Sequence, residues 1–387
     1  MNFRLLALSL GAFAIGVTEF TPMGLLPLIA QEMHVSIPTA GLLISAYAGG
    51  VMIGAPITTL FLSAYRRKSA LLALMALFTM GNLLSVFAPT YELLVASRVL
   101  TSIAHGAFFG IGSLVAASLV PHNRRAAAIA SMFMGLTIAN IAGVPAATWL
   151  GHEAGWRAAF LATGAIGLLT LIALYVALPW DSAQKRPDVS AELRVLVRPS
   201  VIAGLLTTVL SAGSMFTLYT YIAAVLEAVL HASPTLITMM LIVIGVGFTI
   251  GNSISGRLSD RSHNATLAGC LILLSCVSFI FPLVSTTAPG AAVALLIWGG
   301  ASFGVVAPLQ IRVMTLAAEA PALASAVNVG AFNMGNALGA AGGGLVLSMG
   351  LGYQAIAPAG GLFALLALAL AFAPVRQTQE RTAAVQG

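Results

Sequence analysis

Apolar runs of about twenty residues recur along the whole chain, separated by short segments that contain polar residues, proline or glycine. A bilayer core about 30 Å thick is crossed by about 20 apolar residues in a helix, so each run predicts one membrane-spanning helix. The expected spans lie near residues 5–30, 38–63, 69–88, 92–118, 126–150, 156–178, 200–226, 234–256, 265–285, 289–311, 323–348 and 353–374. The sequence therefore predicts an all-α polytopic membrane protein with twelve transmembrane helices.

The composition agrees with this prediction and excludes several classes of soluble protein. Hydrophobic residues make up 59% of the chain and charged residues 7%, whereas about a quarter of a soluble domain is charged. This excludes a cytosolic globular enzyme, a nucleic-acid binder and a disordered chain. The basic residues, which give a net charge of +6, form no stripe suited to nucleic acid. Cys270 and Cys276 share one apolar run and match neither a metal site nor a disulfide framework.

The basic residues predict the orientation of the chain, because lysine and arginine favour cytoplasmic loops. With the N-terminus in the cytoplasm, Arg157 falls outside and Arg98 falls within a span. The other 15 of the 17 basic residues then lie on the cytoplasmic side: Arg4, Arg66, Arg67, Lys68, Arg124, Arg125, Lys185, Arg186, Arg194, Arg198, Arg257, Arg261, Arg312, Arg376 and Arg381. The first run is too long for a signal peptide, and no cleavage site follows it before the second span. Both termini are therefore expected in the cytoplasm.

A long polar loop divides the chain into two similar halves. We expect an N-terminal six-helix bundle at 1–178, a cytoplasmic linker at 179–199, and a C-terminal six-helix bundle with a short cytoplasmic tail at 200–387. Short matches relate the halves, such as Asn140 with Asn336 at an offset of 196. Parallel six-helix repeats with a site between them are typical of transporters.

Five short motifs lie on the predicted spans or at their ends. They are Thr18-Glu19-Phe20-Thr21-Pro22, Arg98 with His105-Gly106 after six residues, Gly135-Leu-Thr-Ile-Ala-Asn140-Ile-Ala-Gly143-Val144-Pro145, Gly155-Trp156-Arg157, and Gly256-Arg257-Leu258-Ser259-Asp260-Arg261. Because it carries these motifs in this order, the whole chain resembles the major facilitator superfamily. Within it, the chain is similar to the twelve-helix drug:proton antiporters, on the branch of sugar-efflux and chloramphenicol-resistance exporters. The resemblance implies two pseudo-symmetric six-helix bundles.

The same resemblance implies a conformational latch at the cytoplasmic end of the eighth span. Its residues would be Gly256, Arg257, Asp260 and Arg261. An ordinary solvated loop is the alternative. The chain departs from the family pattern at two places. The matching loop after the second span keeps basic residues at 66–68 but has no acid at Leu62 or Ser63. In the fifth-span motif, Val144 separates the glycine from the proline.

Glu19 is the candidate proton-coupling residue, because it lies near the middle of the first predicted span. A carboxylate at that depth is costly unless it is neutralised, paired or hydrated, and ionisable groups inside the membrane are usually functional. Burial favours the protonated carboxyl, whereas a nearby arginine favours the ionised form. A carboxyl between these influences could bind and release a proton. The alternative is a permanent ion pair that holds helices together.

The fourth span carries a polar stripe. Thr101, Ser102 and His105 follow Arg98 at i+3, i+4 and i+7, so the four share one helix face. Such a stripe is expected to face the bundle interior or a wet cavity. Arg98 is a candidate partner of Glu19 or of a solute group, with bonds to backbone carbonyls as the alternative. His105 is a candidate proton relay, with neutral packing as the alternative.

Aromatic, methionine and amide side chains suit a cavity for amphipathic solutes. The candidate cavity residues are Thr18, Met23, Tyr47, Thr101, Ser102, Phe108, Asn140, Phe216, Tyr219, Tyr221, Asn333 and Asn336. Plain helix packing is the alternative for each aromatic residue and methionine. Gly135, Gly143 and Pro145 are expected to permit close helix approach and a bend.

The predicted function is proton-coupled export of a small amphipathic solute, such as a drug, a sugar or a related metabolite. A sugar or nucleoside facilitator or symporter of the same fold, and a non-transport membrane receptor, are the alternatives. The sequence contains no Walker A loop, zinc-protease helix, nucleophile elbow or dinucleotide fingerprint. We therefore predict no enzyme activity, ATP use, cofactor or metal. The expected partners are a small-molecule substrate, protons and lipid, with no nucleic acid, and the protein is expected to be a monomer.

Overall fold

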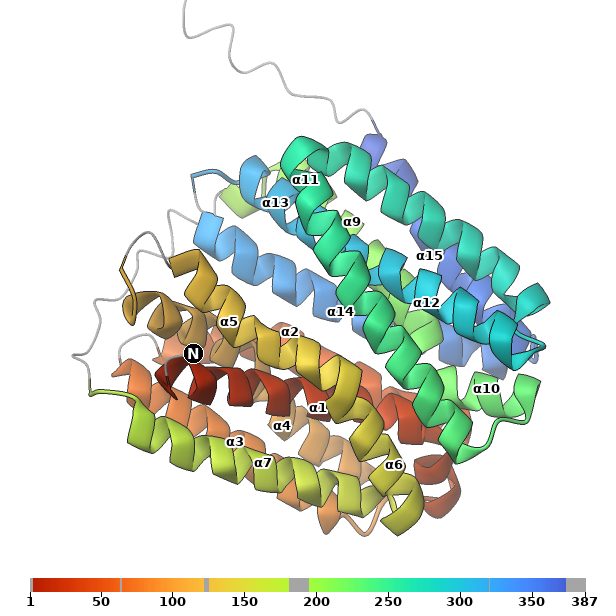
Figure 1. Ribbon diagram of the computed structural model, residues 1–387, viewed down its shortest axis with the longest axis horizontal. Coiled ribbons are helices and arrows are strands. Elements are labelled where there is room, and N and C mark those ends of the chain that lie inside the picture. The colour runs from red at the N-terminus through yellow and green to blue at the C-terminus, as the bar shows by residue number, and fades with distance from the viewer. Residues whose placement is uncertain (1–2, 63–64, 122–124, 181–194, 320, 374–387) are drawn as a thin grey trace, which may run out of the picture.

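The computed structural model describes residues 3–62, 65–121, 125–180, 195–319 and 321–373. These residues form helices joined by short turns, and no strand occurs among them (Figure 1). The all-α prediction is therefore confirmed. Several predicted cytoplasmic basic residues lie outside the described residues, namely Arg124, Lys185, Arg186, Arg194, Arg376 and Arg381.

The helices follow the predicted spans closely. In the first half they are α1 (Phe3–Glu32), α2 (Ile37–Leu62), α3 (Arg67–Val86), α4 (Tyr91–Ser118), α5 (Arg125–Ile138), the π-helical turn η2 (Ala139–Gly143), α6 (Val144–Ala154) and α7 (Trp156–Ala177). In the second half they are α9 (Pro199–Tyr219), α10 (Ile222–Leu230), α11 (Pro234–Val284), α12 (Ala288–Gly304), α13 (Val306–Leu316), α14 (Pro321–Ser348), the 3₁₀ turn η3 (Tyr353–Ala355) and α15 (Ile356–Phe372).

Eleven helical segments among the described residues are long and apolar enough to cross a membrane. The remaining predicted span corresponds to α14, which has 28 residues and packs along α2 and α9. Three asparagines and several glycines lower the hydropathy of α14. Its length and its packing between two spanning helices still place it as the twelfth span.

Interruptions divide three of the predicted spans into two helices each. They are the fifth span (α5 and α6), the seventh (α9 and α10) and the tenth (α12 and α13). In the fifth span, η2 separates α5 from α6, and Pro145 stands in the first turn of α6. Gly135 lies against the Ser9 backbone of α1, and Gly143 lies against Val17 of the same helix. These glycines therefore bring α5 and η2 close to α1 within one half of the molecule.

The eighth and ninth spans are joined more directly than the sequence suggests. Helical structure extends past the expected loop to Arg261, and the non-helical residue is Ser262, with φ −162° and ψ 101°. The Ser262 hydroxyl accepts a hydrogen bond from the Ala265 N–H at 3.2 Å. Ser262 thus caps the N-terminus of the ninth span, as serine commonly does, and no separate loop is needed.

The two halves repeat one helix plan. α1 begins at residue 3 and α9 at residue 199, which is an offset of 196, and α2 begins at residue 37 and α11 at residue 234, which is an offset of 197. These offsets match the short sequence repeats. Figure 1 shows α1 to α7 on one side of the molecule and α9 to α15 on the other.

We call the end of the molecule where α1 and α9 begin the basic end. The turns and helix termini there carry Arg66, Arg67, Arg198 and Arg261. At the opposite end, where α1 stops, Arg157 pairs with Glu32. This ion pair lies within the first half and therefore holds α1 and α7 together.

Contacts between the two halves lie toward the opposite end. The Ser45 hydroxyl of α2 donates to the Ala337 carbonyl of α14 at 3.1 Å, and the Tyr221 hydroxyl fits against Gly41 of α2. A methyl group added at Gly245 of α11 would overlap the Asn140 carbonyl oxygen of η2. These contacts close the molecule at the opposite end.

The same helix faces separate toward the basic end. Gly49 follows Ser45 by one turn, and Gly330 precedes Ala337 by two turns. A methyl group at either glycine would meet no heavy atom within 4 Å, and the same is true at Gly256, three turns beyond Gly245. The two halves therefore diverge toward the basic end.

Candidate functional site

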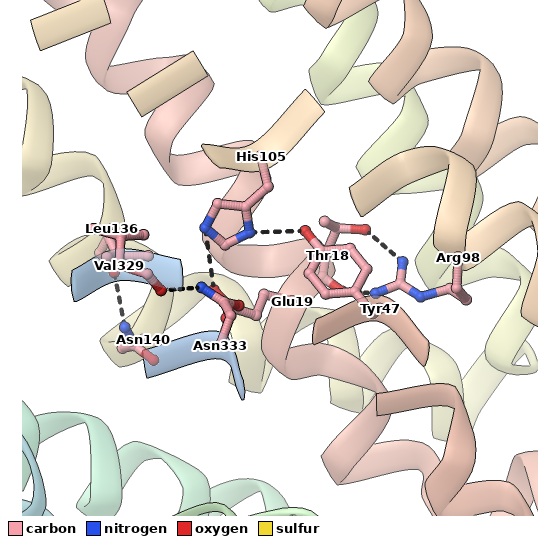
Figure 2. A network of polar contacts seen from close by, with 9 residues as sticks. All are labelled: Thr18, Glu19, Tyr47, Arg98, His105, Leu136, Asn140, Val329 and Asn333. Atoms are coloured by element: carbon pink, nitrogen blue, oxygen red, sulfur yellow. Dashed lines mark hydrogen bonds and ion pairs between the residues drawn. The ribbon is translucent and has the colours of Figure 1, made fainter. Parts of the chain in front are cut away.

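Polar side chains from α1, α2 and α4 meet inside the first half of the molecule (Figure 2). Glu19 is 6% exposed, because α1 is surrounded by other helices along most of its length. Its Oε2 lies 4.0 Å from Nε2 of His105. The Nδ1 atom of His105 lies 3.1 Å from the Tyr47 hydroxyl. Three ionisable groups from three helices therefore stand in one row.

The contact with Tyr47 determines which ring nitrogen of a neutral His105 carries the proton. When the Tyr47 hydroxyl donates to Nδ1 of a neutral His105, the ring proton is on Nε2 and faces Glu19. Protonation of both ring nitrogens would place an imidazolium beside the carboxylate. Within the part of the chain that the structure describes, His105 is the one ion-pair partner of Glu19.

Arg98 is equally buried but is bound elsewhere. Its Nη1 donates to the Thr18 hydroxyl at 3.0 Å, and its Nη2 donates to the Thr18 carbonyl at 2.6 Å. Its guanidinium carbon lies 4.4 Å from the centre of the Tyr47 ring and 5.3 Å from that of Phe160. Among the described contacts, Arg98 forms no ion pair with Glu19. Arg98 therefore binds a backbone carbonyl, which was the alternative to pairing with Glu19.

The sequence of α1 explains why the Thr18 carbonyl is available. In a helix this carbonyl would accept from the N–H four residues later, but that residue is Pro22, which has no N–H. The Thr18 hydroxyl also donates to Oδ1 of Asn82 at 2.7 Å, and the Asn82 amide donates to the Phe78 carbonyl at 2.9 Å. Arg98 is thus fixed to α1 and, through Thr18, to α3.

Asn82 has a clear role that the sequence predictions omitted. It is 0% exposed and lies in the apolar third span. A lone asparagine in such a run is a polar group inside the membrane, and this feature of the sequence could have identified Asn82. Thr101 and Ser102 bond to carbonyls of their own helix, at Ser97 and Val99.

Aromatic rings lie between the two halves. Phe20, next to Glu19, stacks on Phe216 with ring centres 6.2 Å apart and contacts Tyr219 at 5.7 Å. Phe332 meets Phe216 edge-on at 5.6 Å, and Trp298 lies 6.2 Å from Tyr219. The sequence named Phe216 and Tyr219. It missed the other three, because nothing in an apolar run separates such rings from plain packing.

Three buried asparagines carry amide atoms without partners. Asn140 of η2 and Asn333 of α14 each donate through Nδ2 to a carbonyl four residues earlier, at 3.0 Å, and their Oδ1 atoms have no partner. Asn336 has neither amide atom paired. Figure 2 draws Asn140 and Asn333 together with Glu19 and His105. The arrangement combines a carboxylate, a histidine, aromatic faces and free amide oxygens.

Other candidates lie apart from this arrangement. Phe108 packs against Gly11 of α1 in the core of the first half, and Met23 is buried in the main hydrophobic core. Tyr221 lies at the closed end and donates to the Ala340 carbonyl at 2.8 Å. Among the described residues, no cluster of His, Cys, Asp or Glu could hold a metal ion.

The predicted latch residues lie at the basic end of α11. Arg257 and Arg261 are exposed there, and Gly256 has open space beside it. The side chain of Asp260 lies outside the described residues. The predicted latch contacts of Asp260 therefore stay a prediction.

The chain matches known proteins along most of its length. The family model described as Major Facilitator Superfamily matches residues 8–329. The chain is 57% identical to the inner membrane transport protein YdhP of Escherichia coli strain K12, over 98% of each chain. It is 30% identical to a probable sugar efflux transporter of Helicobacter pylori strain 26695, over 94% of this chain and 93% of the relative. A solved bacterial homologue of the human lysosomal transporter Spinster, inward-facing and unoccupied, has the same fold, with a TM-score of 0.75, 17% identity and coverage of 96% of both chains.

Proposed function

Because this chain belongs to the major facilitator superfamily, we propose that it exports a small amphipathic solute from the cytoplasm in exchange for protons. The chain is a multi-pass transport protein of the inner membrane. The proposed solute is a drug, a sugar or a related metabolite, and the name of the Helicobacter pylori relative supports a sugar. Transport proceeds without ATP, by a monomer whose termini are both cytoplasmic.

The observation that carries the proposal is the separation of Glu19 from Arg98. An arginine bound to the carboxylate would hold it permanently ionised. Arg98 instead donates to Thr18, so Glu19 remains free to take up and release a proton. His105, with Nε2 4.0 Å from the carboxylate, and Tyr47 behind it supply a route for that proton.

The divergence of the two halves toward the basic end supports alternating access. Positive-inside orientation places the basic end in the cytoplasm, so contacts such as Ser45 to Ala337 close the periplasmic side. The proton binds Glu19 when the site faces the periplasm. It leaves to the cytoplasm when the halves diverge as they do here, and the solute then binds in its place.

Solute and proton compete in this scheme, and this is the basis of its test. The purified protein is screened by thermal shift against antibiotics, sugars and nucleosides at two pH values. Solutes that bind should raise the melting temperature more at the higher pH, where Glu19 is less protonated. In proteoliposomes, an outward-directed gradient of such a solute should drive protons inward. Proton movement in the same direction as the solute would instead indicate a symporter, and absence of proton movement would indicate a facilitator.

A further inference from the structure

α14 carries three buried asparagines with different surroundings. Asn328 is fully paired: its Oδ1 accepts from the Thr208 hydroxyl at 2.7 Å, and its Nδ2 donates to Oε1 of Gln310 at 2.7 Å. Asn328 thus holds α9, α13 and α14 together. Asn333 and Asn336, one to two turns further along, are 2% and 0% exposed and have unpaired amide atoms.

The orientation of two amides is fixed by their own helices. Nδ2 of Asn333 faces the Val329 carbonyl, and Nδ2 of Asn140 faces the Leu136 carbonyl. An amide oxygen in either position would oppose another oxygen, so the nitrogen must lie there. Each Oδ1 is therefore a hydrogen-bond acceptor directed away from its helix backbone. Asn336 retains both its donor and its acceptor.

Unpaired buried amides are uncommon, because folded proteins pair the great majority of their buried polar atoms. Two of them lie on α14 next to a ring that stands between the halves. Asn333 directly follows Phe332 and Asn336 follows it by one turn, and the Phe332 ring meets that of Phe216 at 5.6 Å. Figure 2 draws Asn333 and Asn140 in one view with Glu19 and His105. The unpaired amide atoms of α14 therefore lie beside the aromatic rings between the two halves.

We infer that Asn140, Asn333 and Asn336 recognise the transported solute through its uncharged hydroxyl or amide groups. This inference rests on the proposed function and narrows its solute class. The two fixed Oδ1 atoms require a donor, which a carboxylate or phosphate lacks. Asn336 can bond a group that both donates and accepts, as a hydroxyl does. Phe20 and Phe216 cover the apolar face of the same solute.

The test compares three probes that share one ring system. Phenyl β-D-glucopyranoside carries hydroxyl donors, its permethylated form carries none, and phenyl glucuronide adds a carboxylate. Melting temperatures of the detergent-solubilised protein are measured with each probe. The glucopyranoside should raise the melting temperature. The permethylated form should bind at least about tenfold more weakly, because both Oδ1 atoms stay unpaired. The glucuronide keeps its ring hydroxyls and should bind more weakly because its carboxylate loses hydration without gaining a donor.

Variants separate recognition from architecture. Asn333→Leu and Asn336→Leu should lose the response to the glucopyranoside, and without probe they should melt at or above the wild-type temperature, since an unpaired buried amide is removed. Asn328→Leu is the matched control from the same helix. It should melt at a lower temperature, because Thr208 and Gln310 lose their partner, and it should keep the preference among the probes.

Several results would overturn the inference. They are the absence of any response to the glucopyranoside, an equal response to its permethylated form, or an Asn336→Leu variant that melts as low as Asn328→Leu and still binds. The last result would indicate a structural amide bridged by water. These assays use no proton gradient. Loss of coupling with intact probe selectivity would therefore contradict the proposed function alone.

Discussion

The Thr18 carbonyl accepts a hydrogen bond from Arg98 at 2.6 Å, and it is free to do so because Pro22 lacks the N–H that would normally occupy it. One proline in α1 therefore decides where the buried arginine is held. The neighbouring carboxyl of Glu19 is left beside His105. Two adjacent residues of α1 thus serve different purposes: Thr18 anchors a fixed charge, and Glu19 carries an exchangeable one.

Thr18→Val tests this anchor. The substitution keeps the side-chain shape but removes the hydroxyl that accepts from Arg98 and donates to Asn82. Two buried polar groups then lose a partner, so the free energy of unfolding should fall by about 2–3 kcal/mol. Thermal unfolding in detergent measures the effect.

Thr163→Val is the control for that variant. Thr163 is also buried but bonds to the Ala159 carbonyl of its own helix, which already has a backbone partner. Its loss should cost less than about 1 kcal/mol. Equal melting temperatures for the two variants would show that Thr18 does not hold Arg98 in place.

Gly41→Ala tests the closed end of the molecule. A methyl group at Gly41 would overlap the Tyr221 hydroxyl, which also lies 2.7 Å from a methyl position at Gly344. The overlap destabilises the closed arrangement, and each 1.4 kcal/mol of such cost shifts the equilibrium about tenfold toward opening of this end. Spin labels at Gln31 and Ala228, exposed residues from the two halves, should move apart.

Two further variants give this prediction its controls. Gly49→Ala lies on the same helix in open space and should leave the label distance unchanged. Adding Tyr221→Ala to Gly41→Ala removes both the hydroxyl and the ring carbons that overlap the new methyl group, and it should restore much of the closed population. An unchanged distance in Gly41→Ala alone would mean that this contact does not govern closure.

Lys68→Gln tests a basic residue that proves to be buried. The Lys68 ammonium donates to the carbonyls of Tyr175 and Leu178 at 2.7 Å each, and it lies 4.4 Å from the centre of the Trp180 ring. It therefore caps the C-terminus of α7, where a cation is favoured. Its replacement should lower the free energy of unfolding by about 1.5–3 kcal/mol.

Arg66→Gln provides the comparison for Lys68. Arg66 is exposed two residues earlier and makes no capping bond, so the free energy of unfolding should stay within about 1 kcal/mol of the wild-type value. If both variants melted alike, the cap on α7 would contribute nothing measurable. In that case Lys68 would contribute only to the orientation of the chain in the membrane.

The spans could be predicted from the sequence because bilayer thickness fixes the length of each apolar run. Interruptions inside a run could not. The break at Tyr221 between α9 and α10 and the π-turn at Asn140 leave the run apolar and so give no polarity signal. Ser262 was assigned to a loop, although its hydroxyl caps the next helix.

Within the site, the sequence identified the buried charges but not their pairing. Glu19, Arg98 and His105 stood out as polar groups in apolar runs. The reach of Arg98 toward Thr18 depends on helix positions that spacing does not provide, although Pro22 marked a carbonyl without a helical partner. The distinction between paired Asn328 and unpaired Asn336 likewise appears only when the neighbouring helices are placed.

Gradient-driven transport by Glu19→Gln tests the central claim most directly. Wild-type and variant proteoliposomes are given the strongest-binding solute from the screen, first under an imposed pH gradient and then under solute exchange at equal pH. Glutamine keeps the size of the side chain but cannot exchange a proton. The account predicts that Glu19→Gln loses accumulation driven by the gradient and retains exchange, while Glu153→Gln, at an exposed position, retains both. Accumulation by Glu19→Gln at the wild-type level would contradict the account.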